Sequence, residues 1–265
     1  MKQRISALVP IYNEENLIRR CLESLKDVVD EIIIIHDGPC TDRTLEIARE
    51  YTDKIFVLER KYMADYHYIE GLNECNGDWI LKIDADEYLS EEIRENIRIM
   101  TDSEIYDCYS FIWPIWDGEK YITKKWPRKD ALFRKNTFSF IELPHMNFQS
   151  KGKIKATDCI LHHQPEYNNY SIGIFSEKHK KWIDLHANSL MKSKIRVYNN
   201  PPEFKIKSVN IRKKYPIILV LFSVKSLLLD LIKFKFIDIR GFFAYHKYKI
   251  YYSIHLFIKL RHLNK

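Results

Sequence analysis

Short apolar runs and helix-like segments alternate along the first hundred residues. The apolar runs read as strands because each one ends in a polar turn; they span residues 5–11, 31–35, 54–58 and 78–83. Apolar residues elsewhere recur at helical spacing, and we expect helices to begin near Asn13, Thr41, Ala64 and Ser90. Strands this apolar belong in a parallel sheet that is covered on both faces. The alternation therefore predicts a doubly wound α/β sheet.

The pattern changes after residue 100. Residues 106–140 are rich in strand-like runs, and Asp117-Gly118 between two of these runs predicts a hairpin. We expect a helix over residues 171–191, and Asn199-Asn200-Pro201-Pro202 breaks the chain. These changes predict a domain of residues 1–200, with halves of about 1–100 and 101–200, and a helical tail of residues 201–265.

The tail differs from the rest of the chain in charge. From Lys205 to Lys265 there are 14 Lys or Arg residues and two acids, which gives +12. Because the whole chain carries +7, the first 204 residues carry −5. A basic, apolar tail predicts an anionic surface as partner, and membrane and nucleic acid both qualify by charge. The chain carries no nucleic-acid recognition motif, so we expect a membrane surface.

Three arrangements fit the two apolar segments of the tail, residues 216–237 and 241–263: amphipathic helices in the membrane plane, a buried helical hairpin, or a membrane span. The first segment exceeds the ~20 residues that a span needs. Four charges interrupt it, namely Lys225, Asp230, Lys233 and Lys235. Each charge near the bilayer centre costs ~2.5–3.5 kcal/mol, so we expect the helices to lie in the plane of the membrane.

Composition and cysteine usage indicate a cytoplasmic protein with a full core. The chain has 265 residues, of which 46% are hydrophobic. Its five cysteines are scattered and no pair has zinc-ligand spacing, which is typical of reduced thiols. The amino terminus runs directly into a strand pattern, without the apolar core of a signal peptide. We expect a cytoplasmic protein, peripheral on the inner face of the cell membrane.

Two carboxylates follow the strand of residues 78–83. Asp84 and Asp86 are spaced i, i+2, so in extended backbone their side chains point the same way and Ala85 points oppositely. Such a pair repels itself unless a cation is present, and Mg²⁺ or Mn²⁺ typically binds carboxylates together with a substrate's phosphates. A solvated acidic strand end is the alternative. The pair predicts a diphosphate site.

Three polar clusters follow three of the predicted strands: Pro10–Glu14, Asp37-Gly38 and Asp84–Asp86. In an open α/β sheet, ligands bind beyond the carboxyl ends of the strands, so all three clusters fall where a ligand is expected. Taken singly, Glu14 has an alternative role at a helix start and Asp37 in a turn. Their coincidence is what predicts the ligand site.

These clusters resemble the glycosyltransferase family 2 enzymes of GT-A fold. The matching residues are Val9–Glu15, Asp37-Gly38 with Thr41–Thr44, and Gly77–Ile80 running into Asp84–Glu87. Beyond residue 90 the chain is similar to the lipopolysaccharide-core branch in outline only. The resemblance implies that residues 1–100 bind the nucleotide and residues 101–200 the acceptor. It also implies a nucleotide-sugar site formed by Pro10, Tyr12, Glu14, Asp37, Asp84 and Ala85.

The resemblance further implies that Asp86 coordinates the divalent cation, with Asp84 near the ribose or the metal. His162 and His163 offer a further metal ligand or diphosphate contact, and we assign the ligand to His162. Relatives of that branch often have His-Glu where this chain has His145-Met146, which leaves the catalytic base open. Glu142 is our nominee for it.

The implied activity is an inverting, metal-dependent transfer of a sugar from a nucleoside-diphosphate sugar to a lipid-linked or cell-envelope glycan acceptor. Two alternatives stand beside it. A degenerate, non-catalytic family member would serve as a membrane-bound scaffold. The second alternative is a nucleotidyltransferase. Such an enzyme would require a glycine-rich phosphate-binding loop near the first strand, and the sequence has none there.

Overall fold

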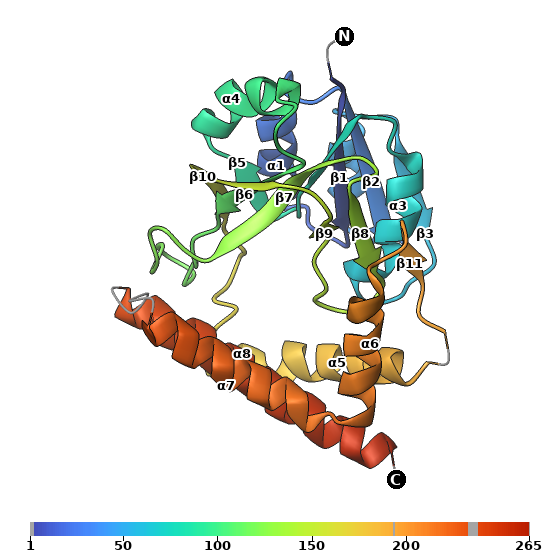
Figure 1. The fold of residues 1–265 in the computed structure, drawn as a ribbon. Coiled ribbons are helices and arrows are strands. Elements are labelled where there is room, and N and C mark those ends of the chain that lie inside the picture. The colour runs from blue at the N-terminus through green and yellow to red at the C-terminus, as the bar shows by residue number, and fades with distance from the viewer. Residues whose placement is uncertain (1–2, 193, 233–237, 265) are drawn as a thin grey trace. The chain divides into compact units, whose positions relative to one another are not determined.

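The computed structural model describes residues 3–192, 194–232 and 238–264, with strands and helices alternating through the amino-terminal part (Figure 1). Its strands are β1 Ile5–Ile11, β2 Glu31–Asp37, β3 Ile55–Leu58, β4 Trp79–Lys82, β5 Glu87–Leu89, β6 Cys108–Ile112, β7 Arg128–Arg134, β8 Phe138–Ile141, β9 Gln149–Ser150, β10 Ile154–His163 and β11 Val197–Tyr198. Its helices are α1 Ile18–Leu25, α2 Thr44–Ala48, η1 Ala64–His67, α3 Tyr68–Glu74, α4 Glu91–Asp102, α5 Ile172–Met191, α6 Glu203–Lys214, α7 Ile217–Ile232 and α8 Ile239–Leu263.

The main sheet has eight strands in the order β3-β2-β1-β4-β7-β6-β10-β5. Strands β3, β2, β1 and β4 run parallel to their neighbours, as the apolar runs predicted. Strand β7 lies antiparallel between β4 and β6, and β6 pairs in parallel with β10. The predicted α/β class with a mostly parallel sheet is therefore confirmed.

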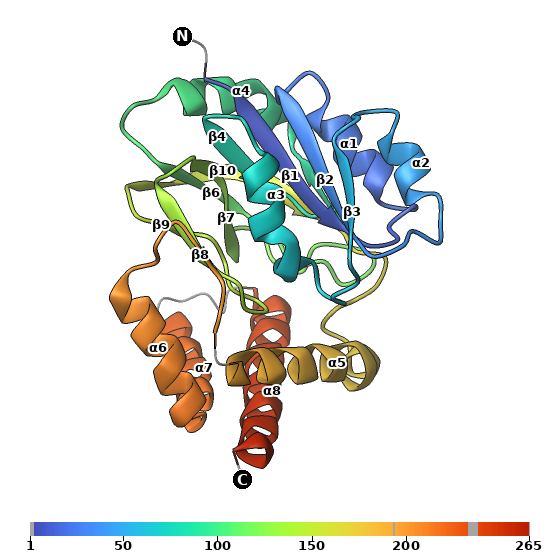
Figure 2. The ribbon, with the colours of Figure 1, turned by 90° about the vertical axis from the view of Figure 1, so that its right-hand side faces the viewer.

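Alternate residues of the central strand β1 pack on opposite faces of the sheet. All seven residues of β1 are buried. Ile5, Ala7 and Val9 belong to the apolar cluster that also contains the buried residues of α1 and α4, whereas Leu8 belongs to the cluster with α3. Figure 2 shows α3 on the face of the sheet opposite α1. Helices on both faces explain why β1 has no polar side: each face of the strand contacts a helix layer.

Two local predictions differ from the structure. Asn13, expected to cap the first helix, has a φ of 49°, and its side chain donates to Thr41 Oγ1 at 2.5 Å. Helix α1 begins only at Ile18, after a turn. The turn at Asp117-Gly118 forms, but its flanks are joined by an isolated Trp116–Tyr121 bridge and by the Ile115 backbone N–H, which donates to Thr123 Oγ1 at 2.8 Å, rather than by a strand ladder. Strand β6 pairs with β7 instead, because a sheet-centre position buries more apolar surface than a two-stranded hairpin.

The chain forms two compact units. The first unit comprises residues 1–114, 125–166 and 197–200, and it contains the main sheet. The second unit comprises residues 115–124, 167–196 and 201–265, and it contains α5 to α8. The chain passes from the first unit to the second at residue 201, where the tail was predicted to start. The second unit also contains residues 115–124 and 167–196, which lie before the predicted tail.

Candidate functional site

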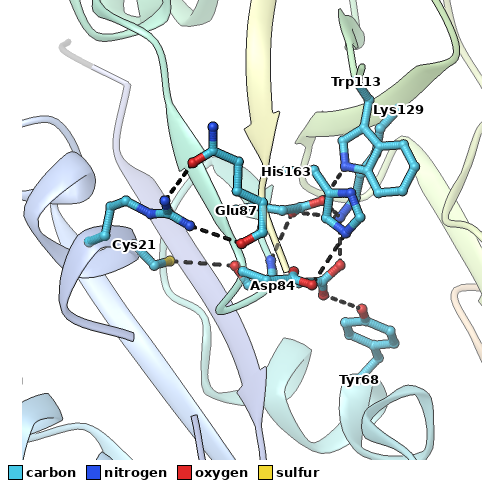
Figure 3. Close-up of polar contacts among 10 residues, drawn as sticks. Cys21, Tyr68, Asp84, Glu87, Trp113, Lys129 and His163 are labelled. Atoms are coloured by element: carbon cyan, nitrogen blue, oxygen red, sulfur yellow. Dashed lines mark hydrogen bonds and ion pairs between the residues drawn. The ribbon is translucent and has the colours of Figure 1, made fainter. Parts of the chain in front are cut away.

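The predicted polar clusters follow three neighbouring parallel strands. β1 lies between β2 and β4, with Ile11 in register with His36 and Leu8 with Lys82. The carboxyl ends of these strands therefore lie at one edge of the sheet, which brings the loops after Ile11, Asp37 and Lys82 together. Helix α1 contacts this edge, where Cys21 Sγ lies 3.5 Å from the carbonyl oxygen of Asp84 (Figure 3).

A buried lysine lies between two carboxylates at this edge. Lys129 Nζ is 2.7 Å from Asp84 Oδ2 and 2.6 Å from Glu87 Oε1, and the lysine side chain is 11% exposed. Glu87 is fully buried and also accepts from Trp113 Nε1 at 2.6 Å and from the Asp84 backbone N–H at 2.9 Å (Figure 3). We call Asp84, Glu87 and Lys129 the lysine cluster. Its ammonium group offsets the repulsion between Asp84 and Glu87, a different pair from the Asp84 and Asp86 considered in the sequence.

The protonation states of the lysine cluster follow from burial and charge. Burial opposes the ionised form of Asp84, but Lys129 and Lys82 outweigh it and hold the pKa of Asp84 below its usual range. Burial raises the pKa of Glu87, and Lys129 offsets only part of that rise. Burial disfavours the charged Lys129, yet Asp84 and Glu87 raise the pKa of Lys129 above its ordinary value. Asp84 and Lys129 are therefore an ion pair at neutral pH.

Asp86 lies beside His163. His163 Nε2 is 3.2 Å from Asp86 Oδ2. The His163 ring stacks on Trp113, with 4.0 Å between the ring centroids (Figure 3). His162, predicted as the metal ligand, stacks instead on Tyr88 at 4.5 Å. Successive side chains of a strand point to opposite faces, so only one of two adjacent histidines on β10 can reach Asp86. The structure thus places His163 beside Asp86, whereas the metal ligand predicted from the sequence is His162.

Asp37 is buried and surrounded by donors from its own chain. Its carboxylate accepts from Arg60 Nη1 at 2.5 Å, from the Lys61 backbone N–H at 2.5 Å and from His67 Nε2 at 2.8 Å. Burial opposes its charge, but His67, Lys61 and Arg60 together hold the pKa of Asp37 below its usual value. The Arg60 guanidinium in turn lies 3.1 Å from the ring centroid of Tyr12. Asp37 thus holds the Arg60 guanidinium against the ring of Tyr12, a residue predicted to lie in the nucleotide site.

The other predicted site residues occupy less chemically distinctive positions. Pro10 and Ala85 are buried, so they contribute shape and backbone groups. The Glu14 backbone N–H donates to Thr44 Oγ1 at 2.6 Å, which ties the loop after β1 to α2. Glu142 directly follows β8 and is half-buried.

One carboxylate that the sequence did not single out lies near Asp84. Asp65, on η1, accepts a hydrogen bond from the backbone N–H of His145. Burial raises the pKa of Asp65 to about 6, with Asp84 adding to the rise and Lys82 opposing it. Lys82 is itself buried, 4.7 Å from the ring centroid of Tyr68, whose hydroxyl lies 3.3 Å from Asp84 Oδ1. The pKa of Asp65 is therefore raised well above that of an ordinary aspartate.

The Asp86 carboxylate is a hard oxygen donor of the kind that Mg²⁺ or Mn²⁺ takes, and His163 lies beside it. Ligand atoms on neighbouring positions of an octahedral ion with ~2.1 Å bonds lie ~3 Å apart, close to the Asp86–His163 separation of 3.2 Å. Asp86 is 25% exposed, so it is accessible to an ion and its water. Among the described residues, no group of three or more His, Cys, Asp or Glu side chains is arranged to hold a metal ion.

Comparison with known proteins identifies the family. The family model described as glycosyl transferase family 2 matches residues 6–195. The chain belongs to glycosyl transferase family 2. This membership, together with the observed sheet, confirms the predicted GT-A fold and places the chain in a family of glycosyltransferases.

Several relatives of this family member carry glycosyltransferase names. An uncharacterized glycosyltransferase of Rickettsia felis is 38% identical over 40% of this chain and 37% of its own length. The undecaprenyl-phosphate 4-deoxy-4-formamido-L-arabinose transferase of Photorhabdus laumondii is 29% identical over 74% of this chain and 59% of its own length. This chain thus aligns with little more than a third of the Rickettsia relative.

Solved structures show a more distant likeness. Glucosyl-3-phosphoglycerate synthase of Mycobacterium tuberculosis matches 69% of this chain and 79% of its own, with 13% identity and a TM-score of 0.45. TarS of S. aureus matches 73% of this chain and 40% of its own, with 15% identity and a TM-score of 0.43. At these scores the likeness adds nothing to the family assignment.

Proposed function

We propose that this glycosyltransferase moves a sugar from a nucleoside-diphosphate sugar to a glycan or lipid-linked acceptor of the cell envelope. The observation that carries the proposal is the meeting of three loops at one sheet edge: Asp84 and Asp86 follow β4, Tyr12 follows β1, and Arg60, which lies on the Tyr12 ring, follows β3. Tyr12, Arg60 and Asp37 would contact the nucleotide, and Asp84 and Asp86 would lie near its ribose and diphosphate.

Asp86 and His163 would hold a divalent cation, Mg²⁺ or Mn²⁺, with water and the donor's phosphates filling its remaining positions. When bound, the cation would neutralise charge that develops on the leaving diphosphate. Lys129 keeps Asp84 ionised and in place, so that a single orientation meets the donor.

Transfer in this proposal is a single inverting displacement. A carboxylate takes the proton of the acceptor hydroxyl while that oxygen attacks the anomeric carbon, and the nucleoside diphosphate leaves from the opposite side. Asp65 is our candidate for the base, because a pKa of about 6 suits a group that accepts a proton near neutral pH. Glu142, nominated from the sequence, is the carboxylate to compare with it.

A screen of sugar nucleotides with Mn²⁺ tests this function through release of nucleoside diphosphate. With the active donor, we expect Asp86→Ala to lower turnover at least ~10²-fold, as the loss of one charge-stabilising element does. Asp102→Ala, at an exposed carboxylate of α4, is the matched control and retains turnover. Asp65→Asn loses turnover and Glu142→Gln retains it if the base is assigned correctly. Release from no donor would favour the scaffold alternative.

We propose that the reaction takes place on the cytoplasmic face of the membrane, where the protein would meet a lipid-linked acceptor. The support is the net charge of +12 between Lys205 and Lys265, combined with the apolar residues of the same segment. No single described helix is long and apolar enough to cross a membrane. Helices α6 and α7 taken together, with a bend of 114° between them, meet the length and composition required of a span.

A further inference from the structure

Helix α7 contacts its neighbour α8 through polar side chains. The polar side chains on α7 are those of Ser223, Ser226 and Asp230, whose i, i+3 and i+7 spacing places them on one face of the helix. We call the side-chain pairs between the helices the polar seam: Ser223 Oγ–Ser253 Oγ at 2.6 Å, Lys249 Nζ–Ser226 Oγ at 2.8 Å and His246 Nε2–Asp230 Oδ2 at 3.3 Å. The two helices lie side by side along this seam (Figure 1).

The opposite face of α7 is apolar and exposed. We call its five residues the apolar stripe: Ile217, Leu221, Val224, Leu228 and Ile232. Their spacings of four, three, four and four residues put them on one side of a helix with 3.6 residues per turn. They are between 39% and 72% exposed in the second unit.

This arrangement reverses that of a helix in a water-soluble domain, which buries its apolar stripe and exposes its polar residues. Contiguous exposed apolar surface marks a site of interaction. In lipid the reversed arrangement is favourable, because hydroxyl and charged groups pair between helices while aliphatic side chains contact hydrocarbon.

The charge around the stripe favours a lipid surface over a second copy of the chain. Arg212, Lys213 and Lys214 occupy the last turn of α6, just before α7, and the exposed Lys225 lies within α7. A second copy would bring its own +12 segment against this one, whereas anionic lipid supplies the opposite charge.

We propose that α7 lies along an anionic bilayer, with its apolar stripe in the headgroup–acyl boundary and the polar seam turned to α8. The stripe runs the whole ~24 Å length of the helix, so a helix in the membrane plane contacts lipid with all five residues. Lys225 then extends its ammonium group to the headgroups. This inference rests on the membrane location in the proposed function, and it does not depend on the proposed sugar transfer.

Flotation of the full chain with vesicles tests the assignment. The vesicles contain phosphatidylcholine alone or with 30% phosphatidylglycerol, and the variants are Leu221→Gln/Leu228→Gln in the stripe and Ile99→Gln/Ile105→Gln as the control. The control residues are 70% and 61% exposed in the first unit, so both variants remove two exposed aliphatic side chains. Circular dichroism and nucleoside-diphosphate binding by each variant check the fold and the transferase site separately.

We expect the wild type and the control to bind the anionic vesicles equally, and the stripe variant to bind at least ~10-fold more weakly, which corresponds to ~1.4 kcal/mol. Equal binding by all three would overturn the assignment. So would a wild type that ignores vesicles but forms a concentration-dependent dimer that the stripe variant loses, since the stripe would then contact a second copy. A wild type that binds vesicles but no nucleoside diphosphate would refute the proposed function and leave the membrane assignment of α7 standing.

Discussion

Replacing Lys129 with methionine is expected to leave two neighbouring carboxylates without their shared cation. Lys129 Nζ lies 2.6 Å and 2.7 Å from the two oxygens of Glu87 and 2.7 Å from Asp84 Oδ2. Methionine fills much of the same volume, so the principal change is the loss of charge. Glu87 is fully buried, whereas the Asp84 side chain is 39% exposed and has access to water. The cost therefore falls mainly on Glu87.

The size of the effect can be bounded from this burial. Breaking a buried ion pair by removing one partner costs ~3–5 kcal/mol. Because Asp84 is partly solvated, we take the lower end and expect the free energy of unfolding to fall by about 3 kcal/mol at pH 8. Removing the second charge, in Lys129→Met/Glu87→Gln, leaves a neutral side chain at position 87. We expect that variant to recover about half of the loss.

The loss should also depend on pH. In Lys129→Met the folded chain binds protons at Glu87 and Asp84 more readily than the unfolded chain, because no ammonium group opposes protonation. Stability then falls as pH rises, since the folded state holds more protons than the unfolded one. The destabilisation should be larger at pH 8 than at pH 5, and Glu87→Gln should remove most of this difference.

Urea denaturation at pH 5 and pH 8 measures these differences, with Lys155→Met, at an exposed lysine of β10, as the control. A Lys129→Met protein as stable as the wild type would contradict the assignment of an ion pair. An equal loss at both pH values, unaffected by Glu87→Gln, would mean that lost packing rather than charge causes the destabilisation.

Three further predictions concern single side chains. His163→Ala should weaken Mn²⁺-linked nucleotide binding about 10-fold, as loss of a metal contact does, and His162→Ala should not; titration calorimetry that finds the reverse would reinstate His162. Glu31→Gln should lower stability by about 2 kcal/mol at pH 7 and by much less at pH 2. Burial opposes the charge of Glu31, but Lys54, Ser6 and the Asn76 backbone lower its pKa from 4.5 to about 2, so its contribution is lost between those pH values; an equal loss at both would refute this. Gly77→Ala should lower the melting temperature by at least ~4 °C because its Cβ would lie 2.6 Å from the Ser6 backbone nitrogen, and a melt no lower than that of the neighbouring control Asn76→Ala would contradict it.

The parallel part of the sheet was predictable from sequence because its signals are local. Each of β1, β2 and β4 is a short apolar run that ends in a polar turn, and both features are read from adjacent residues. The rule that ligands bind beyond carboxyl strand ends then sufficed to select Asp37, Asp84 and Asp86. Neither step requires knowledge of which distant segments pair.

Lys129 and His163 could not be selected in that way, because their roles depend on long-range register. The antiparallel pairing of β7 with β4 joins Leu132 to Leu81, and the same register carried outward brings Lys129 opposite Asp84. His163 is in register with Glu87 through the pairing of β10 with β5. A shift of one residue in β10 would have put His162 there instead, so sequence spacing alone could not distinguish the two histidines.

The inverted pattern of α7 needed coordinates for a related reason. The sequence shows an apolar segment interrupted by charges, and that pattern fits a buried hairpin as well as a membrane-surface helix. Only the seam with α8 shows that Ser223, Ser226 and Asp230 face a neighbouring helix. The exposed side of the helix is therefore its aliphatic side.

Calorimetric titration of UDP, GDP and dTDP, in Mn²⁺ and in EDTA, tests the central claim most directly. We predict that at least one nucleoside diphosphate binds in Mn²⁺, that EDTA weakens this binding at least ~10-fold, and that Asp86→Ala removes the dependence on Mn²⁺. Binding of equal strength in Mn²⁺ and EDTA, unchanged in Asp86→Ala, would contradict a cation site at Asp86 and His163. A wild type that binds none of the three would contradict the donor site for those nucleotides.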